Sequence, residues 1–526
     1  SLIGMGNTAI DEQVVEILKD LPEIEKISIG DAYILEKARP LIEVMEERGM
    51  SGNYPGYKKY KQAMEKLDSL MSVEEIVIYV GNDAPIKTLS RAREIVRVLK
   101  KNYPEKSYRV KFLGGEYNFE ETVSFDAEDS GTVEKPIIYE AEEGEEVIFK
   151  GSKELDVNSF SGITDENILK RLKREVRERV LELDLASCGI TEIAAFKNRG
   201  FDEASQEYAG LYLDGKKQRV AEYPNGNGIY SRWEEILEKG GSDYSEGEGG
   251  KIKVSEERIG NWQNAEDIWV GGYFSYDYRY ERLNVYSIDK ENNAIKFLHA
   301  SGAGIINEES KRWKAFNVLE EIDVPGEWYI DRNTMKLYYY PPYDVKNSRM
   351  TLSCLNSAFI NMAGTENVQI KGITFAETKE SCIILDAETK NVDIIGCSFK
   401  NTEKCGIKMK GSKTGSFESS YNYIDAPSEI EIRDCDFYEI GAHAIFVVGG
   451  GNRETLTPGN NKVINNYVEK ASQNARGIPA INLRGGVGNS VENNSIKNTP
   501  FHAINFFGND HKIMYNEITN ACNEAT

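Results

Sequence analysis

Long hydrophobic runs, histidine clusters and paired cysteines are all missing from this chain of 526 residues. No stretch of 18 apolar residues occurs, so the sequence predicts no membrane-spanning helix within it. Only four His are present and the seven Cys show no Cys-x-x-Cys spacing, which argues against a zinc or disulfide framework. We therefore expect no metal and no cofactor, and nothing in the sequence supports a calcium site.

Positive charge is also scarce, because 64 Lys and Arg stand against 86 Asp and Glu, for a net charge of −22. This balance argues against nucleic acid and anionic membranes as partners. Glycine and tyrosine are plentiful, with 46 and 29 residues, as is typical of a turn-rich β protein.

Repeated phrases are the clearest positive feature of the sequence. PAINLRGGVGN at 479–489 returns as HAINFFGND at 502–510 and, earlier, as HAIFVVGGGN at 443–452. NSVENNSI at 489–496 likewise returns as HKIMYNEI at 511–518. A recurring phrase of this length predicts a repeat architecture.

Aligning the phrases gives columns of equivalent residues. An anchor column and a column five residues later are both apolar, and between them lies a column that changes from Ile and Cys to Asn. A second phrase begins 13 residues after most anchors, so each repeat is predicted to hold two short strands with a fixed corner. The anchors are Ile370, Ile394, Ile432, Val463, Val491 and Ile513, and the asparagines are Asn466, Asn494 and Asn516.

Short strands at a minimum period of 22–24 residues, with no helical pattern between them, predict the stacked coils of a parallel β-helix. Stacking at the ordinary strand spacing would turn the asparagine column into an inward ladder that satisfies backbone groups. Cys397 and Cys435 share that column as small apolar fillers and are expected to be reduced and buried.

The rest of the chain divides by pattern. We expect a helical module at 1–74, the first coils with a capping helix at 75–194, an inserted β-sandwich at 195–350 and further coils at 351–526. The fold class is thus mainly β, a parallel β-helix with an inserted domain. The charged segment TDENILKRLKREVRERVLELDL, from residue 164, is expected to be a solvated helix.

Three groups of motifs resemble known families. VVEILKDLPEIEKISIGDAYILEKARPLIEVM resembles a three-helix module found beside catalytic domains in secreted or cell-surface proteins of Gram-positive bacteria, which implies such a location. EIVIYVGNDAPIKTLSRAREIV and VKFLGGEYNFEETVSF resemble the start of right-handed parallel β-helix proteins that act on carbohydrates. RVAEYPN, VPGEWYIDRNTMKLYYYPP and GNDHKIMYNEI resemble β-helix glycoside hydrolases of the β-xylosidase and α-L-fucosidase or xylanase types.

The resemblance implies a glycoside hydrolase acting on plant or host polysaccharide side chains, which needs two carboxyl groups at the glycosidic bond. Asp510 is the first candidate, because Asn-Asp-His replaces the glycine-rich turn that follows the equivalent strands. Glu524 and Glu517 are further catalytic candidates. A hydrogen-bonded turn explains Asp510 equally well, and a solvated surface position explains Glu517.

Substrate-binding candidates lie around the same turn and in the aromatic region. His443 and His502 stand before Ala-Ile in two coils, so a structural role in the repeat is an alternative for His502. Trp262 and Trp269, in a loop-like segment, are expected to line a cleft. The candidate set is His511, His502, Asn509, Arg484, Asn505, Trp262 and Trp269.

Two alternatives remain open at the sequence level. A polysaccharide lyase on the same scaffold would need a Lys or Arg base and cations beside a uronate, and the coils offer Arg484 but no such cluster. A non-catalytic carbohydrate-binding or adhesion protein fits the scaffold too. Because the sixth repeat lacks its second phrase, we expect a C-terminally incomplete chain whose second catalytic carboxyl lies beyond Thr526, and hence weak activity.

Overall fold

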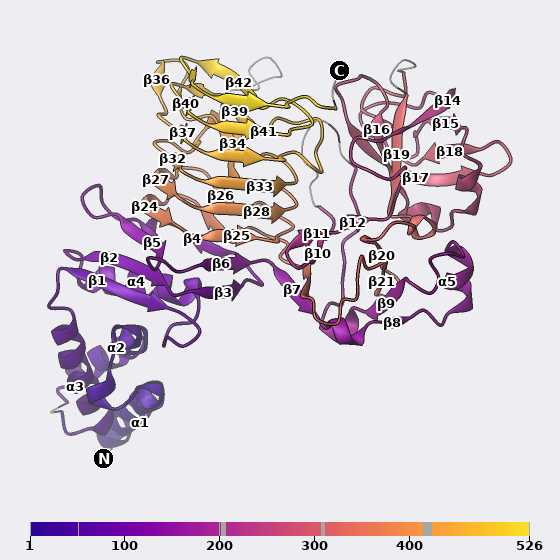
Figure 1. The fold of residues 1–526 in the computed structure, drawn as a ribbon. Helices are drawn as coiled ribbons and strands as arrows, with labels where there is room; N and C mark the ends of the chain where they lie inside the picture. Colours follow the sequence, from indigo (N-terminus) through magenta and orange to yellow (C-terminus); the bar gives the residue numbers. More distant parts are fainter. Residues whose placement is uncertain are drawn as a thin grey trace.

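Three parallel sheets, stacked coil upon coil, form the body of the protein in the computed structural model (Figure 1). The structure describes residues 2–50, 52–198, 200, 207–306, 311–413 and 423–524. Sheet 1 has nine strands in the order β1-β2-β5-β24-β27-β32-β37-β40-β43. Their bounds are Glu75–Val80, Ser107–Phe112, Ile137–Ala141, Glu366–Lys371, Lys390–Ile395, Glu431–Arg433, Lys462–Ile464, Ser490–Glu492 and Lys512–Met514.

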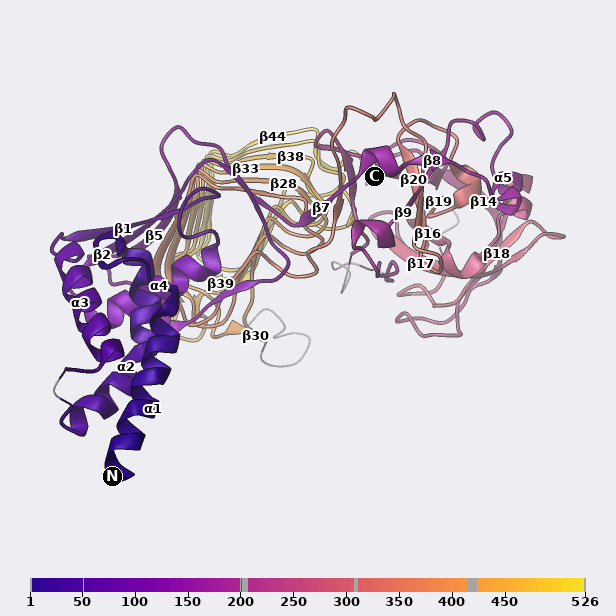
Figure 2. The same cartoon turned by 90° about the horizontal axis from the view of Figure 1, so that it is seen from below.

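Sheets 2 and 3 complete each coil. Sheet 2 contains β3 Gly115–Asn118, β6 Val147–Lys150, β25 Thr374–Ala376, β28 Ser398–Thr402, β33 Asp436–Ile440, β38 Tyr467–Glu469, β41 Ser495–Lys497 and β44 Glu517–Thr519. Sheet 3 contains β4 Val123–Phe125, β23 Ile360–Met362, β26 Ile383–Leu385, β29 Ile407–Met409, β34 Ile445–Val448, β39 Ile481–Val487 and β42 Ile504–Asn509. Figure 2, which looks along the stack, shows the strands of successive coils superimposed.

The predicted register is confirmed. Ile370 pairs with Ile394, which pairs with Ile432, and the anchor column continues in the same way to Ile513. Phe375, Phe399 and Phe437 stack with ring centroids 5.2 and 4.7 Å apart.

The Asn ladder is present as well. Nδ2 of Asn466 donates to Oδ1 of Asn494 at 3.0 Å, and Nδ2 of Asn494 donates to Oδ1 of Asn516 at 2.9 Å. Cys397 and Cys435 are buried in the same column.

Each coil contributes three strands rather than the two we expected. The first phrase is broken by a residue in the left-handed region, such as Gly372, Gly396 or Asp434, with φ of 68°, 60° and 57°. This conformation turns the chain from sheet 1 into sheet 2 and is accessible to Gly, Asn and Asp at low cost. A second left-handed column, including Asn401 and Glu439 with φ of 56° and 53°, ends the strands of sheet 2.

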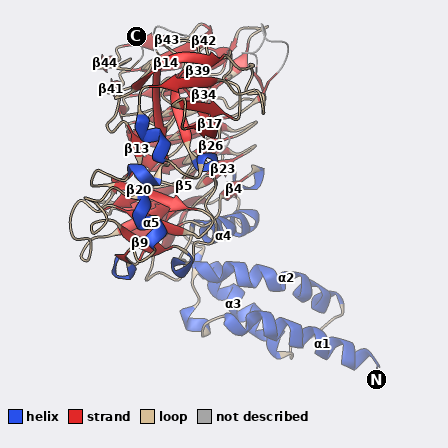
Figure 3. Cartoon of the chain, turned by 90° about the vertical axis from the view of Figure 1, so that its right-hand side faces the viewer, coloured by secondary structure: helices blue, strands red, loops and turns tan. Residues whose placement is uncertain are grey.

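Helices cover the first coil. Helix α4, Leu89–Asn102, packs Ile95, Val96 and Leu99 into the same core as Val110 and Phe112 of β2. The N-terminal helices α1 Leu2–Ile17, α2 Ala32–Glu47 and α3 Pro55–Leu70 contact one another and extend away from the stack (Figure 3). Among the described residues, no helix is long and apolar enough to cross a membrane.

Strands β7 Ser152–Leu155 and β22 Met350–Ser353 pair antiparallel and mark where the chain leaves and rejoins the coils. They share a sheet with β10 Leu211–Leu213 and β11 Lys216–Lys217. A five-stranded sheet follows, with the order β12-β20-β21-β9-β8. Its bounds are Arg219–Val220, Glu327–Asp331, Lys336–Tyr339, Leu181–Asp184 and Ser161–Gly162.

The inserted β domain contains a barrel where we expected a sandwich. Strands β14, β15, β18, β17, β16 and β19 pair in this order, and the additional β19–β16 pairing closes the ring. Their bounds, with that of the flanking β13, are β13 Glu222–Tyr223, β14 Ser231–Glu238, β15 Lys251–Val254, β16 Trp269–Tyr273, β17 Glu281–Asp289, β18 Ala294–Phe297 and β19 Arg312–Phe316.

The N-terminal border of the inserted region differs from the expected residue 195, because β8 and β9 pair inside its five-stranded sheet. In place of the long charged helix there is only α5, Glu166–Arg171, followed by turns and β9. Two short hairpins, β30 Ser412–Lys413 with β31 Tyr423–Ile424 and β35 Gly451–Asn452 with β36 Thr457–Pro458, project from the coils.

Candidate active site

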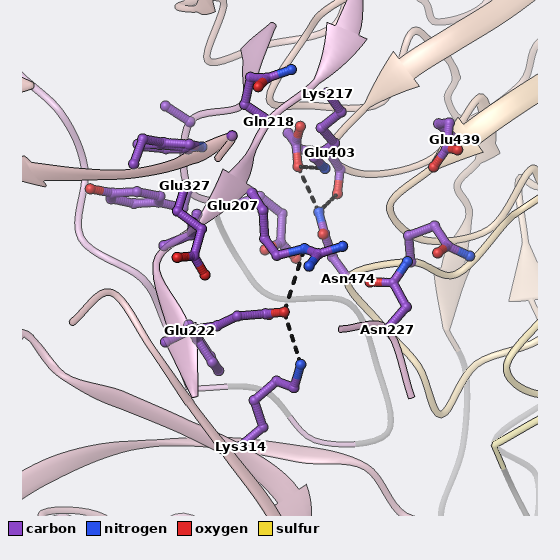
Figure 4. A pocket seen from close by; sticks show the side chains of 18 of the residues that line it. Glu207, Lys217, Gln218, Glu222, Asn227, Lys314, Glu327, Glu403, Glu439 and Asn474 are labelled. Carbon is purple, nitrogen blue, oxygen red and sulfur yellow. Dashed lines mark hydrogen bonds and ion pairs between the residues drawn. The ribbon is translucent and has the colours of Figure 1, made fainter. Parts of the chain in front are cut away.

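A cavity of about 760 Å³ lies where the coils face the inserted region (Figure 4). The coil wall is formed at the ends of sheet 2 strands in successive coils, by Asn401, Glu403, Glu439, Gln473 and Asn474. The same corner therefore recurs in β28, β33 and after β38, so that polar side chains from separate coils line up. The opposite wall comes from β11, β12, β13, β19 and β20 of the inserted region.

Glu403 joins the two walls. Its Oε1 accepts a hydrogen bond from the Tyr212 hydroxyl at 2.7 Å, and its Oε2 accepts from Lys217 Nζ at 2.6 Å and Asn474 Nδ2 at 2.7 Å. The side chain is buried. Because three donors, one of them a cation, surround it, this carboxylate is held in place and supplied with a counter-charge.

Glu222 is a second carboxylate of the cavity and lies on β13. Its Oε1 is 3.0 Å from Lys314 Nζ, 3.4 Å from Arg219 Nε, and accepts from the Gly226 N–H at 3.1 Å. All of these contacts go to one oxygen. Glu222 is thus ion-paired with two cations that also line the cavity.

Glu327, the first residue of β20, has the opposite environment. It is 1 % exposed, and burial together with the nearby charges of Asp323 and Glu222 raises its pKa to about 7. Its Oε2 accepts from the Asp323 and Val324 N–H groups, both at 2.9 Å, which offsets part of that rise. Its Oε1 is buried and has no hydrogen-bond partner among the described residues.

Register explains why these groups meet. Arg219 on β12 lies opposite Glu327 on the parallel strand β20, and Glu222 follows three residues later on β13. Figure 4 shows Glu327 and Glu222 on the inserted side of the cavity and Glu403 with Asn474 on the coil side.

An aromatic and charged floor completes the cavity. Phe196 stacks on Tyr208 with centroids 4.0 Å apart, and Tyr208 stacks on Trp328 at 5.7 Å. Arg282 is buried beside this floor, where burial lowers its pKa to about 10, and its Nη2 donates to Glu207 at 3.1 Å. Arg282 therefore stays charged at neutral pH.

The turn at Asn509, Asp510 and His511 lies at the end of β42, and none of the three lines the cavity. His511 Nδ1 accepts from the Asn489 N–H at 3.2 Å, and Asn489 accepts from Asn461 N–H at 3.1 Å in the same way. The imidazole thus continues a second asparagine ladder, and its Nε2 donates to the Phe507 carbonyl at 3.0 Å. Asp510 is exposed at a left-handed position with φ of 56°.

Glu517 and Glu524 are separated by their surroundings. Glu517 is exposed on β44 and accepts from Ser495 at 3.3 Å. Glu524 accepts from Arg476 Nε at 2.5 Å and Tyr230 at 2.9 Å. Burial alone would raise the pKa of Glu524, but the hydrogen bond and charge of Arg476 lower it overall. Glu524 therefore anchors the C-terminal segment to the inserted region just outside the cavity, whose lining includes Arg476 and Tyr230.

The remaining sequence-based candidates also lie away from the cavity. His502 is exposed and stacks on Phe501 at 3.9 Å, and partial burial lowers its pKa. Arg484 and Asn505 lie on β39 and β42 of sheet 3.

The expected cleft-wall role of Trp262 and Trp269 is wrong, because both are buried in hydrophobic cores. Trp262 donates from Nε1 to Glu321 at 2.7 Å.

Sequence reasoning missed Glu222, Glu327 and Glu403, which come from three distant segments. One signal was available for Glu327, because an acidic residue directly precedes the run Trp328, Tyr329 and Ile330 in β20. For Glu403 the signal was weaker: its counterparts in the neighbouring coils are Lys379 and Gly441, so the position does not follow the repeat.

Comparisons with known proteins agree on the architecture. The family profile described as "Right handed beta helix region" matches residues 291–473, roughly a third of the chain. A solved structure described as "Glycoside hydrolase" has 13% sequence identity and a TM-score of 0.52, covering 85% of this chain and 96% of that one. Another, "The complex structure of XylC with xylose", has 12% identity and a TM-score of 0.39, covering 84% of this chain and 64% of that one.

No curated protein matches the chain. The family profile and the structure with a TM-score of 0.52 establish a shared fold, and that fold is the right-handed parallel β-helix.

Proposed function

We propose that the protein is a glycoside hydrolase whose sugar substrate binds in the cavity between the coils and the inserted region. The observation that carries this proposal is the pair Glu327 and Glu222. Glu327 is buried and has a pKa of about 7, whereas Glu222 lies 3.0 Å from Lys314 Nζ and 3.4 Å from Arg219 Nε. Glycosidic cleavage requires two carboxyl groups with different roles, and the two environments differ in this way: one carboxyl is buried without a cation paired to it among the described residues, and the other is paired with two cations.

In the proposed reaction, Glu327 donates its proton to the glycosidic oxygen as the bond to the anomeric carbon breaks. The Glu222 carboxylate either attacks that carbon or takes a proton from the attacking water, and in both cases the leaving sugar departs as a neutral alcohol. Glu403 is a positioning residue in this scheme, because its hydrogen bonds with Tyr212 and Lys217 join the two walls and its bond with Asn474 fixes it on the coil wall.

The cavity has the remaining features of a sugar site. Amide side chains of Asn401, Gln473 and Asn474 line the coil wall, and amides suit the hydroxyl groups of a saccharide. The opposite floor is aromatic, which suits the C–H face of a pyranose ring. Action on plant or host polysaccharide side chains, at the cell surface or outside the cell, is part of the same proposal.

A polysaccharide lyase is a second candidate because Lys314 is an unusual amine. It is 8 % exposed, and burial, followed by the charges of Arg476 and Arg219, lowers its pKa. A lysine that loses its proton more easily can abstract the proton beside a uronate carboxylate. A lyase would release a product with a new C=C bond that absorbs ultraviolet light, whereas hydrolysis would release a reducing sugar without that absorbance.

The test is hydrolysis of a panel of aryl glycosides and oligosaccharides by the wild-type protein and by Glu327→Gln and Glu222→Gln. Each substitution should lower kcat by at least about 100-fold if the residue transfers a proton or attacks. Asp510→Asn and Glu517→Gln are the matched controls, since both carboxylates are exposed and outside the cavity, and they should stay within about twofold.

The opposite result would overturn the proposed site. If Asp510→Asn or Glu517→Gln abolishes activity while the cavity variants keep it, the catalytic centre is the turn after β42. If saccharides bind and no variant or substrate shows turnover, a binding protein is the better description. Loss of activity in Glu403→Gln but not in Glu222→Gln would show that the second catalytic carboxylate is Glu403, on the coil wall.

A further inference from the structure

Three cations converge on one side of the cavity. Arg219, Lys314 and Arg476 all line it, and the charges of the two arginines each lower the pKa of Lys314. Their positive fields therefore overlap.

Carboxylates balance these cations only in part. Glu222 is shared between Arg219 and Lys314, at 3.4 and 3.0 Å, and Glu524 pairs with Arg476. Among the described residues around this side of the cavity, three cations thus face the carboxyl groups of Glu222 and Glu524. Glu327 adds no negative charge below its pKa of about 7, so it does not restore the balance.

The excess charge is directed to the cavity rather than to bulk water. Lys314 is 8 % exposed, and besides Glu222 its Nζ donates only to the Gly226 carbonyl, at 2.6 Å, among its described contacts. Arg219 lines the cavity, has a side chain that is 40 % exposed, and has its Nε 3.4 Å from Oε1 of Glu222. A guanidinium in this position can turn to a ligand carboxylate and form two parallel hydrogen bonds with it.

We propose that the cavity selects an acidic saccharide, one whose sugar ring carries a carboxylate or a sulfate, with Arg219 as the principal contact and Lys314 and Arg476 supplying the field. The inference rests on the proposed function for its location, since it assumes that the sugar binds in this cavity. It is independent of the reaction type, because a hydrolase and a lyase would both need the same recognition.

The experiment measures binding and so does not depend on turnover. Titration calorimetry with the Glu327→Gln protein compares matched methyl glycosides that differ in one group: glucuronide with glucoside, galacturonide with galactoside, and galactoside 6-sulfate with galactoside. The acidic member of at least one pair should bind at least about tenfold more tightly. The comparisons with uronides and with the sulfated galactoside identify which acidic group is recognised.

Two further measurements assign that preference to the cavity. Arg219→Met should remove most of it, whereas Lys346→Met, which deletes an exposed positive charge outside the cavity, should leave it unchanged. The preference of the Glu327→Gln protein for the acidic sugar should also shrink as the salt concentration is raised, because salt screens the contact between Arg219 and the acidic group.

The outcomes separate the two proposals. Equal binding of acidic and neutral partners, or a preference that survives Arg219→Met and high salt, would overturn the acidic-sugar inference and leave the hydrolase proposal standing. Binding of acidic sugars with no turnover of any substrate would support the inference and count against the hydrolase.

Discussion

Replacing Asn494 by alanine tests the ladder that holds the coils in register. Asn494 is 1 % exposed, and its side chain accepts from the Asn466 N–H at 3.0 Å and donates to the Val463 carbonyl at 2.9 Å. Alanine would leave both buried backbone groups without partners. Each of the two orphaned groups costs about 1–3 kcal/mol, so the free energy of unfolding should fall by about 2–6 kcal/mol.

Two spectroscopic probes report on different parts of the chain. All five Trp lie between residues 233 and 328, so tryptophan fluorescence reports the inserted region, while far-UV circular dichroism reports the whole chain, including the coil strands. Urea unfolding of Asn494→Ala should move the circular dichroism midpoint to lower urea. The fluorescence transition moves only if the two regions unfold as one.

The control is Ser495→Ala, one residue further along the chain. Ser495 is half-buried and makes one weak contact, with Glu517 at 3.3 Å, so its removal should change stability by less than about 0.5 kcal/mol. An unchanged circular dichroism midpoint in Asn494→Ala would refute the ladder as a source of stability. An equal shift in both variants would show that any change in this coil has the same effect.

Three further predictions concern charge and domain borders. Arg476→Met should destabilise the protein by about 3–5 kcal/mol near pH 7, because it leaves the Glu524 carboxylate buried without its counter-charge. Since the pKa of Glu524 is lowered in the folded state, the stability difference between wild type and variant should shrink as pH drops below about 4.5. A constant difference in urea midpoint from pH 7 to pH 3 would contradict this. For Glu327 the sign is reversed, because its pKa is raised: its contribution to folding stability is complete below about pH 4.5 and is lost as pH rises through about 7. Wild-type stability should therefore fall by about 3 kcal/mol relative to Glu327→Gln between these pH values, which melting curves at several pH values would measure. Limited proteolysis should first cut near the paired strands β7 and β22, and even cleavage throughout the coils would argue against a separable inserted region.

The coils were predictable because their information is local and repeated. An Asn where neighbouring repeats carry Ile or Cys can only be buried if its amide bonds the backbone, and Asn466, Asn494 and Asn516 do so. His511 shows the limit of the same logic. It departs from the glycine-rich turn, yet its imidazole accepts a backbone N–H just as the Asn489 amide does, so a change of residue type preserved the structural role.

The barrel and the cavity depend on contacts between distant segments. Closure of the ring requires β16 to pair with β19, and the sequence of neither strand indicates which strand it pairs with. Glu222, Glu327 and Glu403 come together only because the inserted region packs against the ends of the sheet 2 strands. Trp262 was assigned to a loop from its polar neighbours, but its ring fills the barrel core and its N–H meets a buried carboxylate, Glu321.

The most direct test of the central claim is the dependence of the Glu327→Gln rate on the leaving group. A dinitrophenyl glycoside releases a stable anion and needs no proton, whereas an alkyl glycoside of the same sugar does. If Glu327 is the acid, the variant should lose at least about 100-fold on the alkyl glycoside and less than about tenfold on the dinitrophenyl glycoside. An equal loss on both substrates, with the fold intact, would show that Glu327 does not donate the proton and would contradict the assignment of this cavity as the catalytic site.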